Sequence, residues 1–306
     1  MCLVTFAVGE HARYPFVLLA NRDERYERPS AALHFWEDQP AVLAGRDLEH
    51  GGTWLGLTRS GRFATLTNHP FTEWQPHEPV SRGSLVSDFL KGDHSAEAYL
   101  DVLRASRQRY EGYHLIFGSL EGGLWVYSNV EDCVERYAHG LHSVGNTYDD
   151  LTMHKEMRSL GLLAGYLGMA VSMGVIGGEQ ETQNLADGGL ASGDTTDTFT
   201  THREVLDPDE LLEIFQDSVP ASNLTIIPEQ LPLEVARNNS SIFIKGDYFG
   251  TVGSTVILVD RDGWVHAKEV RYNQEDMIEI SEKQFKLGPS EQSVRPHGQV
   301  TNEVNE

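Results

Sequence analysis

The sequence lacks several features that would each point to a class of protein. Its 24 Lys+Arg stand against 46 Asp+Glu, a net charge of −22 over 306 residues, and no basic run is present. Nucleic acids and anionic lipid headgroups are bound by clustered cations, so we expect no nucleic-acid partner. The two cysteines, Cys2 and Cys133, exclude a disulfide scaffold and fit a reducing compartment. Glycine-rich dinucleotide or phosphate-binding loops are also missing, which disfavours a doubly wound nucleotide-binding fold.

Targeting signals are equally scarce. The first residues carry no basic segment and only a short apolar run, so we expect a protein that is not secreted. Residues 159–178 carry no charge and are long enough to span a bilayer, which leaves membrane contact open. Their many glycines and the acidic flank that follows favour a core helix ending at Gly174 or Gly177.

Hydrophobic patterning predicts an α+β protein. Apolar, β-branched runs separated by turn residues predict strands at Cys2–Val8, Phe16–Asn21, Ala41–Gly45, Thr53–Thr58, Phe63–Asn68, His114–Gly118, Leu124–Ser128, Val134–Tyr137, Ser254–Val259 and Val265–Tyr272. Helical periods and caps predict helices at Ser84–Leu90, Ser95–Arg109 and 152–173, and one that starts at Asp207-Pro208. Strands first, helices in the middle and strands last indicate layers of sheet and helix.

We expect one domain over residues 1–287. An acidic, low-complexity stretch at about 177–203 is predicted to be a disordered insertion, and 288–306 a disordered polar tail.

The surroundings of Cys2 follow from hairpin arithmetic. If the first turn centres near Ala12, antiparallel partners sum to about 24, which places Cys2 opposite Arg22 on one face of the sheet. Removal of Met1 would give Cys2 a free α-amine that can act as base for its own thiol. Arg22 could then stabilise a thiolate and Asp23 could hold the ammonium. A register slip of one residue would exchange these neighbours, and Asn-Arg-Asp-Glu is also an ordinary polar strand exit.

Several blocks of residues together resemble the transport and Golgi organization 2 family, also called the NRDE family. The resemblance covers roughly residues 1–272 apart from the acidic insertion. The residues that carry it are Met1-Cys2, Asn21–Glu24, Gly51–Gly56, Thr67-Asn68, Ser81–Val86, Tyr113–Gly118, Gly145-Asn146, Lys155 and Ser254–Val259. Val252 stands where the family usually has Arg, and Met153-His154 where it has Trp-Pro.

This resemblance implies a fold and a site. The fold is a four-layer αββα sandwich of the N-terminal nucleophile (Ntn) hydrolase type. Cys2 matches the nucleophile, Arg22 and Asp23 match the groups around it, and Asn68 and Asn146 lie where such folds stabilise an oxyanion. Family members are linked to intracellular heme trafficking and to lipid or acyl-CoA homeostasis. We therefore expect a cytoplasmic, mitochondrial or Golgi-associated protein.

Two functions follow as hypotheses, with a ligand-free scaffold as a third. The first is a carrier that holds a hydrophobic, carboxylate-bearing ligand such as heme or an acyl-lipid. Its candidate ligand-binding residues are Asn21, Arg22, Glu24, Trp54 and His69, because Arg anchors propionates and Trp stacks on a porphyrin. His11, His50 and His114 are further candidate axial ligands, and Trp74 a further stacking residue. The second is a cysteine hydrolase that cleaves an amide or thioester with Cys2. We expect no required cofactor and no metal site, and we predict no oligomeric state.

Overall fold

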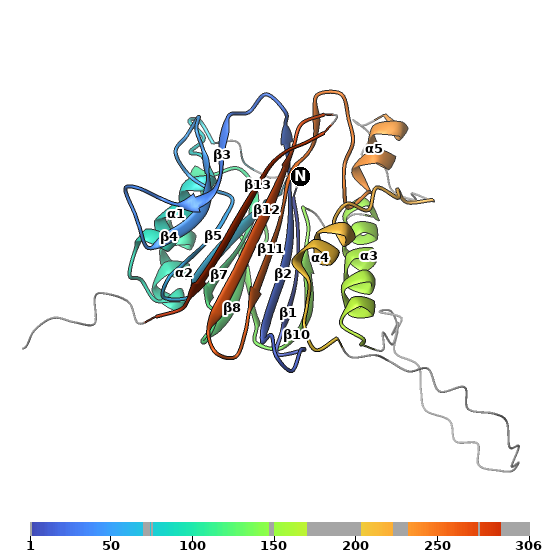
Figure 1. Cartoon of the computed structure of the whole chain (residues 1–306). Coiled ribbons are helices and arrows are strands. Elements are labelled where there is room, and N and C mark those ends of the chain that lie inside the picture. Colours follow the sequence, from blue (N-terminus) through green and yellow to red (C-terminus); the bar gives the residue numbers. More distant parts are fainter. Residues whose placement is uncertain are drawn as a thin grey trace, which may run out of the picture.

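Two antiparallel sheets with helices on their outer faces make up the computed structural model of this chain (Figure 1). The structure describes residues 2–69, 74, 76–146, 150–169, 203–222, 232–274 and 276–288. The predicted α+β class is confirmed. The predicted acidic insertion and polar tail lie outside the described residues except at Arg203 and Gly288, and so does Met1.

The first sheet has six strands and contains both the first and the last strand of the described chain. Its order is β10-β1-β2-β11-β12-β13. These strands are β1 (Cys2–Val8), β2 (Phe16–Arg25), β10 (Gly140–Val144), β11 (Phe249–Val259), β12 (Trp264–Tyr272) and β13 (Met277–Lys286). The predicted hairpins β1–β2 and β11–β12 are present, the latter turning at Gly263 with a φ of 81° that suits glycine.

The second sheet has seven strands in sequence order, a meander with one helical excursion. Its strands are β3 (Ser30–Phe35), β4 (Val42–Asp47), β5 (Leu55–Thr58), β6 (Arg62–Asn68), β7 (Tyr113–Ser119), β8 (Gly123–Ser128) and β9 (Cys133–Tyr137). The excursion between β6 and β7 contains α1 (Gly83–Lys91), α2 (Ala96–Ala105) and the 3-10 turn Arg107–Arg109. Ser95 caps α2 by accepting a hydrogen bond from the Ala98 amide, as predicted.

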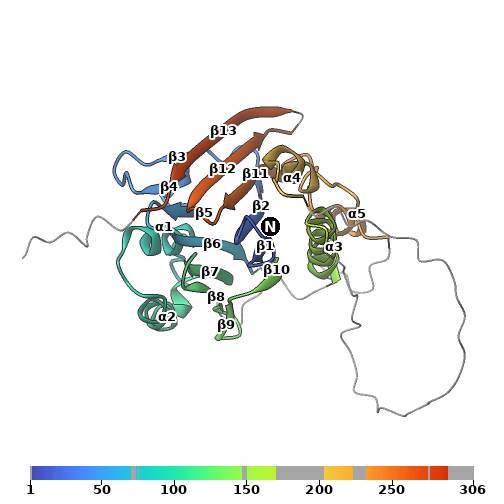
Figure 2. The ribbon, with the colours of Figure 1, turned by 60° about the horizontal axis from the view of Figure 1, so that its bottom comes forward.

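Helices cover the outer face of each sheet (Figure 2). α1 and α2 pack on the seven-stranded sheet. α3 (Asp150–Tyr166) and α4 (Pro208–Ile214) pack on the six-stranded sheet, and α5 (Leu233–Asn239) contacts α3. α4 begins with the predicted Asp207 cap and Pro208 in its first turn.

Apolar side chains fill three layers between these elements. One cluster lies between the sheets and includes Leu18, Phe63 and Ile257. The other two lie under the helices, one beneath α1 and α2 and one beneath α3 and α4. β2 serves two of these layers, because Leu18 faces the other sheet and Leu19 faces the helices. This explains why β2 reads as a continuous apolar run before its polar end.

Some predicted boundaries were wrong. α3 ends at Tyr166 and turns at Gly168, whose φ is 71°, so the predicted helix to 173 does not continue through 167–169. Residues 170–202 lie outside the description. No helix in the described ranges is long and apolar enough to cross a membrane. The predicted helix to Arg109 stops at Ala105 and gives way to the 3-10 turn, and β3, β10, β13 and α5 were not predicted.

Candidate functional site

The predicted pairing at the start of the chain is confirmed. Cys2 lies directly opposite Arg22, at the end of β1, and both are buried. β11 flanks β2 on its other side, and its register with β2 shifts between Thr251 and Gly253. Val252 is the extra residue of this β-bulge, at the position where an Arg was expected. A bulge bends and twists its strand and occurs often beside functional sites.

Arg22 is a buried cation on which the carboxylates of Glu24, Asp47 and Glu269 act electrostatically, without forming an ion pair with it among the described residues. Its guanidinium lies 4.1 Å from the centre of the Trp54 ring and donates a hydrogen bond of 3.0 Å to the Ser30 hydroxyl. Within the described ranges no Asp or Glu oxygen comes within 4.0 Å of it. Burial lowers the pKa of Arg22, and the nearby Cys2 and Glu24 oppose that shift. A guanidinium in this setting is ready to accept an anionic ligand.

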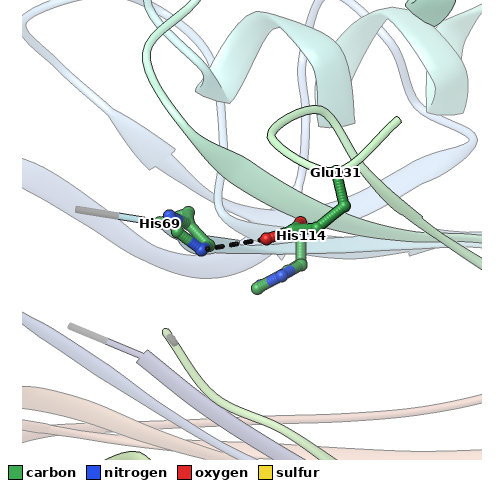
Figure 3. A group of neighbouring side chains, drawn as sticks. All are labelled: His69, His114 and Glu131. Atoms are coloured by element: carbon green, nitrogen blue, oxygen red, sulfur yellow. Dashed lines mark ion pairs between the residues drawn. The ribbon is translucent and has the colours of Figure 1, made fainter. Parts of the chain in front are cut away.

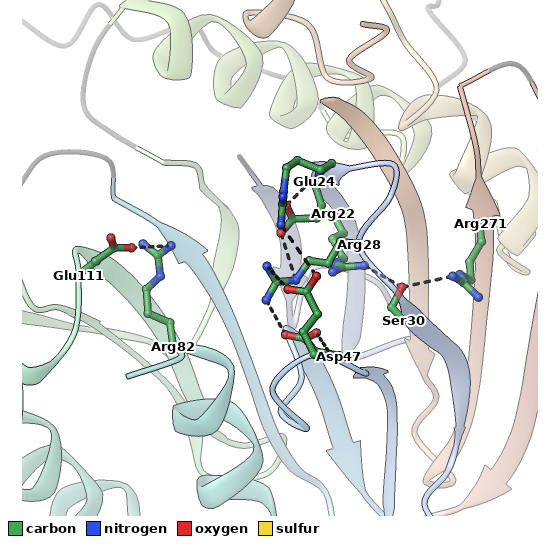
Figure 4. Close-up of polar contacts among 10 residues, drawn as sticks. Arg22, Glu24, Arg28, Ser30, Asp47, Arg82, Glu111 and Arg271 are labelled. Atoms are coloured by element: carbon green, nitrogen blue, oxygen red, sulfur yellow. Dashed lines mark hydrogen bonds and ion pairs between the residues drawn. The ribbon is translucent and has the colours of Figure 1, made fainter. Parts of the chain in front are cut away.

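The other arginines in this region carry carboxylate partners, which Figure 4 shows for Arg28 and Arg82. Arg28 pairs with Asp47 at 2.8 Å, and Glu24 lies 3.7 Å from it. Arg271 pairs with Glu279 at 2.8 Å and shares the Ser30 hydroxyl with Arg22, at 3.2 Å. Further along, Arg82 pairs with Glu111 at 3.2 Å. Arg22 therefore differs from these arginines, because in the part of the chain that the structure describes its hydrogen-bond partner is a neutral hydroxyl.

Close backbone approaches put Trp54 in place. A Cβ on Gly52 would lie 2.5 Å from the Gly83 carbonyl carbon, and the Thr53 amide donates to the Gly83 carbonyl at 3.2 Å. A Cβ on Gly45 would lie 2.5 Å from the Trp54 ring. Gly52 is thus required by its close contact with Gly83 at the start of α1, and this contact fixes the backbone that carries the indole under Arg22.

Asp23 lies on the opposite face of β2 from Arg22, because neighbouring strand residues alternate. It accepts a hydrogen bond of 2.7 Å from the Thr251 hydroxyl and lies 4.0 Å from the Lys155 ammonium of α3. Burial raises the pKa of Asp23, and Lys155 opposes that shift. Lys155 is itself only 1% exposed. Cys2 and Asp23 therefore face different layers.

Asn21 shares this helix-facing side and is fully engaged there. Its amide nitrogen donates to the Phe215 and Ile242 carbonyls, each at 2.9 Å, and its oxygen accepts from Ser254 at 2.6 Å. These bonds tie β2 to the segments that follow α4 and α5. In this arrangement the predicted ligand-binding residue Asn21 holds the fold together.

Asn146 contacts Asn68 at its backbone carbonyl and not at its side chain. The Asn146 side-chain nitrogen donates to the Asn68 carbonyl at 2.6 Å, and the Asn146 side-chain oxygen is buried without a hydrogen-bond partner in the described part of the chain. The structure thus brings the two residues together, and one of the two N–H donors of the Asn146 amide is used in this contact.

His69 and His114 lie side by side at the ends of β6 and β7, with ring centres 5.3 Å apart. Glu131 approaches from the turn after β8, 3.6 Å from the His69 Nε2 (Figure 3). Burial lowers the pKa of His114 to about 4, and His69 adds to the shift. The sequence analysis missed Glu131, because only the strand order brings it to the histidines.

The remaining candidate aromatics have other surroundings. The His11 ring contacts the Arg203 carbonyl at 2.7 Å and accepts from the amides of Arg13 and Tyr14, so both of its nitrogens are occupied by backbone. His50 is exposed. The Trp74 indole donates to the Tyr110 carbonyl at 3.1 Å.

Comparison with known proteins decides the family. The family model described as Transport and Golgi organisation 2 matches residues 1–274. This chain belongs to that family. The human Transport and Golgi organization protein 2 homolog is 38% identical over 130 residues, which is 39% of this chain and 46% of that protein. The match thus spans about half the length of this relative, and the Bos taurus homolog is 39% identical over a similar share.

More distant likenesses extend over most of the chain. An uncharacterized protein of Saccharomyces cerevisiae is 24% identical over 86% of this chain and 88% of its own length. Among solved structures, the C2A mutant of a conjugated bile acid hydrolase from Clostridium perfringens covers 95% of this chain and 98% of its own, with a TM-score of 0.45 and 12% identity. An N-acylethanolamine-hydrolyzing acid amidase ortholog from Caenorhabditis elegans covers 84% and 92%, with a TM-score of 0.43 and 10% identity.

Several of the sequence blocks that resemble the Transport and Golgi organisation 2 family lie close together in the structure. Asn21–Glu24 and Gly51–Gly56 supply Arg22 and Trp54, and Ser81–Val86 supplies the Gly83 contact that holds Trp54. Lys155 approaches Asp23 from α3, on the helix-facing side of β2. Blocks that are far apart in the chain therefore meet around one strand end.

Proposed function

We propose that this chain is an intracellular carrier that binds a hydrophobic small molecule through its carboxylate or phosphate groups, at Arg22. Heme and acyl-CoA are the first candidates, since each joins an apolar body to such groups. We also propose that the fold is a four-layer sandwich of the Ntn-hydrolase type, working in the cytoplasm, in mitochondria or at the Golgi. The word transport in the names of the family and the human relative fits a carrier.

The observation that carries this proposal is the burial of the Arg22 guanidinium without an ion pair to any described carboxylate. A buried guanidinium normally has a carboxylate beside it, because desolvating an unpaired charge is costly. Arg22 is 8% exposed, stacks on Trp54 and, among the described residues, donates only to the neutral Ser30 hydroxyl. Arg28 and Arg271 use the nearby carboxylates themselves. A ligand anion in direct contact would supply a counter-charge to Arg22 and would accept hydrogen bonds from its remaining N–H groups.

Titration of the purified full chain with hemin and with palmitoyl-CoA tests this proposal. We expect saturable binding of at least one of them, and Arg22→Met should weaken it about 10- to 100-fold, because a hydrogen-bonded charge is worth about 1.5–3 kcal/mol. Arg25→Met is the matched control, since Arg25 lies on the same strand with a side chain 59% exposed. Equal affinities of the two variants would refute the anchoring role.

The alternative function is that of a cysteine hydrolase. It is favoured by the position of Cys2, which faces Arg22 on the inner side of the sheet, where the guanidinium could stabilise a thiolate. Against it stands the bulged Val252 in place of an Arg. The carrier is therefore the better supported of the two.

Intact-mass measurement separates the two functions first. The hydrolase requires an α-amine on Cys2, so a retained Met1 ends that hypothesis. If Met1 is absent, turnover of acyl-amide and acyl-thioester panels by the wild type, lost in Cys2→Ser, would support the hydrolase. Ligand binding that survives Cys2→Ser without any turnover supports the carrier.

A further inference from the structure

We propose that His69, His114 and Glu131 form a binding site for one divalent transition-metal ion, with Zn²⁺ as the best match. Each residue offers one ligand atom, and these three atoms lie within 4.8 Å of one another. No metal site was predicted from the sequence, in which the three residues are spread over 63 positions.

Three adjacent strands bring the residues together. His114 on β7 pairs with Thr67 on β6 and with Ser128 on β8. His69 follows β6 two positions after Thr67, which places its ring beside that of His114. Glu131 sits in the turn three positions after Ser128. The donors therefore come from the ends of paired strands, where rigid backbone positions them.

The donor set selects the class of metal. Two imidazoles and one carboxylate suit Zn²⁺, whereas Mg²⁺ and Ca²⁺ prefer oxygen ligands. Two donors bound tetrahedrally to one zinc ion at about 2.1 Å lie about 3.4 Å apart. The His69 Nε2 and a Glu131 oxygen, at 3.6 Å, are already close to this separation. A pair of donors at the outer bound of 4.8 Å would have to approach by roughly 1.4 Å when the ion binds.

The surroundings also resemble those of a metal site. The Ser128 hydroxyl donates to the second oxygen of Glu131, and the Thr67 hydroxyl lies 3.4 Å from the His114 Nδ1. Such outer contacts orient ligands and strengthen metal binding. Both histidines are buried, at 7% and 4% exposure.

Space for a further ligand lies beside His114. A cavity of about 60 Å³ is lined by His114, Ser128, Cys133, Glu135 and Glu156. It is large enough for a water molecule and contains polar partners for one. With three protein ligands, the ion would keep a fourth position open toward this cavity, the arrangement found in zinc sites that bind an exchangeable ligand.

The test is metal binding by the full chain after treatment with EDTA. We expect one equivalent of Zn²⁺ to bind, and Co²⁺ in its place to give a visible tetrahedral absorption band that zinc abolishes. His114→Ala and Glu131→Gln should each weaken Zn²⁺ binding at least 100-fold, since loss of an outer contact alone costs 10- to 100-fold. His50→Ala, at an exposed histidine outside the cluster, should leave it unchanged.

Two outcomes would overturn the proposal. Absence of stoichiometric Zn²⁺ binding would do so, and so would binding that is unchanged in both cluster variants. Because Glu131 is half-exposed in a turn, Glu131→Gln should fold even if His114→Ala does not. Arg22→Met should keep its zinc affinity, so failure of the carrier proposal would leave this result intact.

Discussion

Glu269 gives a prediction whose size follows from the structure. Its carboxyl is 2% exposed, accepts a hydrogen bond of 2.6 Å from the Leu33 amide of the opposite sheet, and lies near Arg271 and Arg22. Burial raises the pKa of Glu269 from 4.5 to about 7, against the opposing effect of these partners. The folded protein therefore holds a proton here that the unfolded chain releases near pH 4.5.

The sign of the effect follows by linkage. Between pH 4.5 and pH 7 the folded state binds one more proton than the unfolded state, so this residue's contribution to the free energy of unfolding falls as pH rises. A pKa difference of about 2.5 units, at 1.36 kcal/mol each, makes the loss about 3 kcal/mol. Glu269→Gln keeps an acceptor for the Leu33 amide but does not titrate, so it should remove this pH dependence.

Urea unfolding of wild type and Glu269→Gln at several pH values from 4.5 to 8 measures the effect. We expect the variant to gain about 3 kcal/mol relative to wild type across that range. The difference between the two proteins cancels the contributions of other titrating groups to the free energy of unfolding. His114 is one of them, and its lowered pKa makes stability rise with pH and not fall. A difference that stays constant within about 0.5 kcal/mol would refute the reasoning.

Further predictions concern the two faces of β2. Lys155→Met should lower the free energy of unfolding by about 3–5 kcal/mol, because it removes the buried ammonium beside the buried Asp23, and adding Asp23→Asn should restore part of that loss. Urea unfolding measures both, and a double variant no more stable than the single would contradict the pairing. Gly45→Ala should displace Trp54 from beneath Arg22, costing about 1–3 kcal/mol of stability. It should also weaken ligand binding; unchanged tryptophan fluorescence and affinity would speak against that contact.

Local reasoning predicted the centre of the site because the β1–β2 hairpin is short. The position of its turn determines the register, and the register places Cys2 opposite Arg22. The residues that contact the Arg22 guanidinium come from other segments of the chain. Ser30 begins β3 and Trp54 directly precedes β5, both strands of the second sheet. The sequence around Arg22 does not indicate that these two residues contact it. The packing of two sheets decided those contacts.

The same distinction explains the missed elements. β13 lies at a sheet edge and mixes exposed apolar side chains such as Met277 and Ile280 with charged ones, so its pattern resembles a polar segment. β10 is a short partner of β1 whose strand character comes from that pairing. Glu131 joins the two histidines only because β6, β7 and β8 are neighbours. In each case tertiary pairing determined the outcome.

The central claim is that Arg22 binds the anionic groups of the ligand. The measurement that tests it most directly compares hemin with hemin dimethyl ester on wild type and on Arg22→Met, by titration under one set of conditions. Esterification should weaken binding to wild type about 10- to 100-fold, and to Arg22→Met by less than about threefold. An equal loss of affinity in both proteins would show that binding of the hemin carboxylates does not depend on Arg22, and would contradict the proposed anchoring role of this residue.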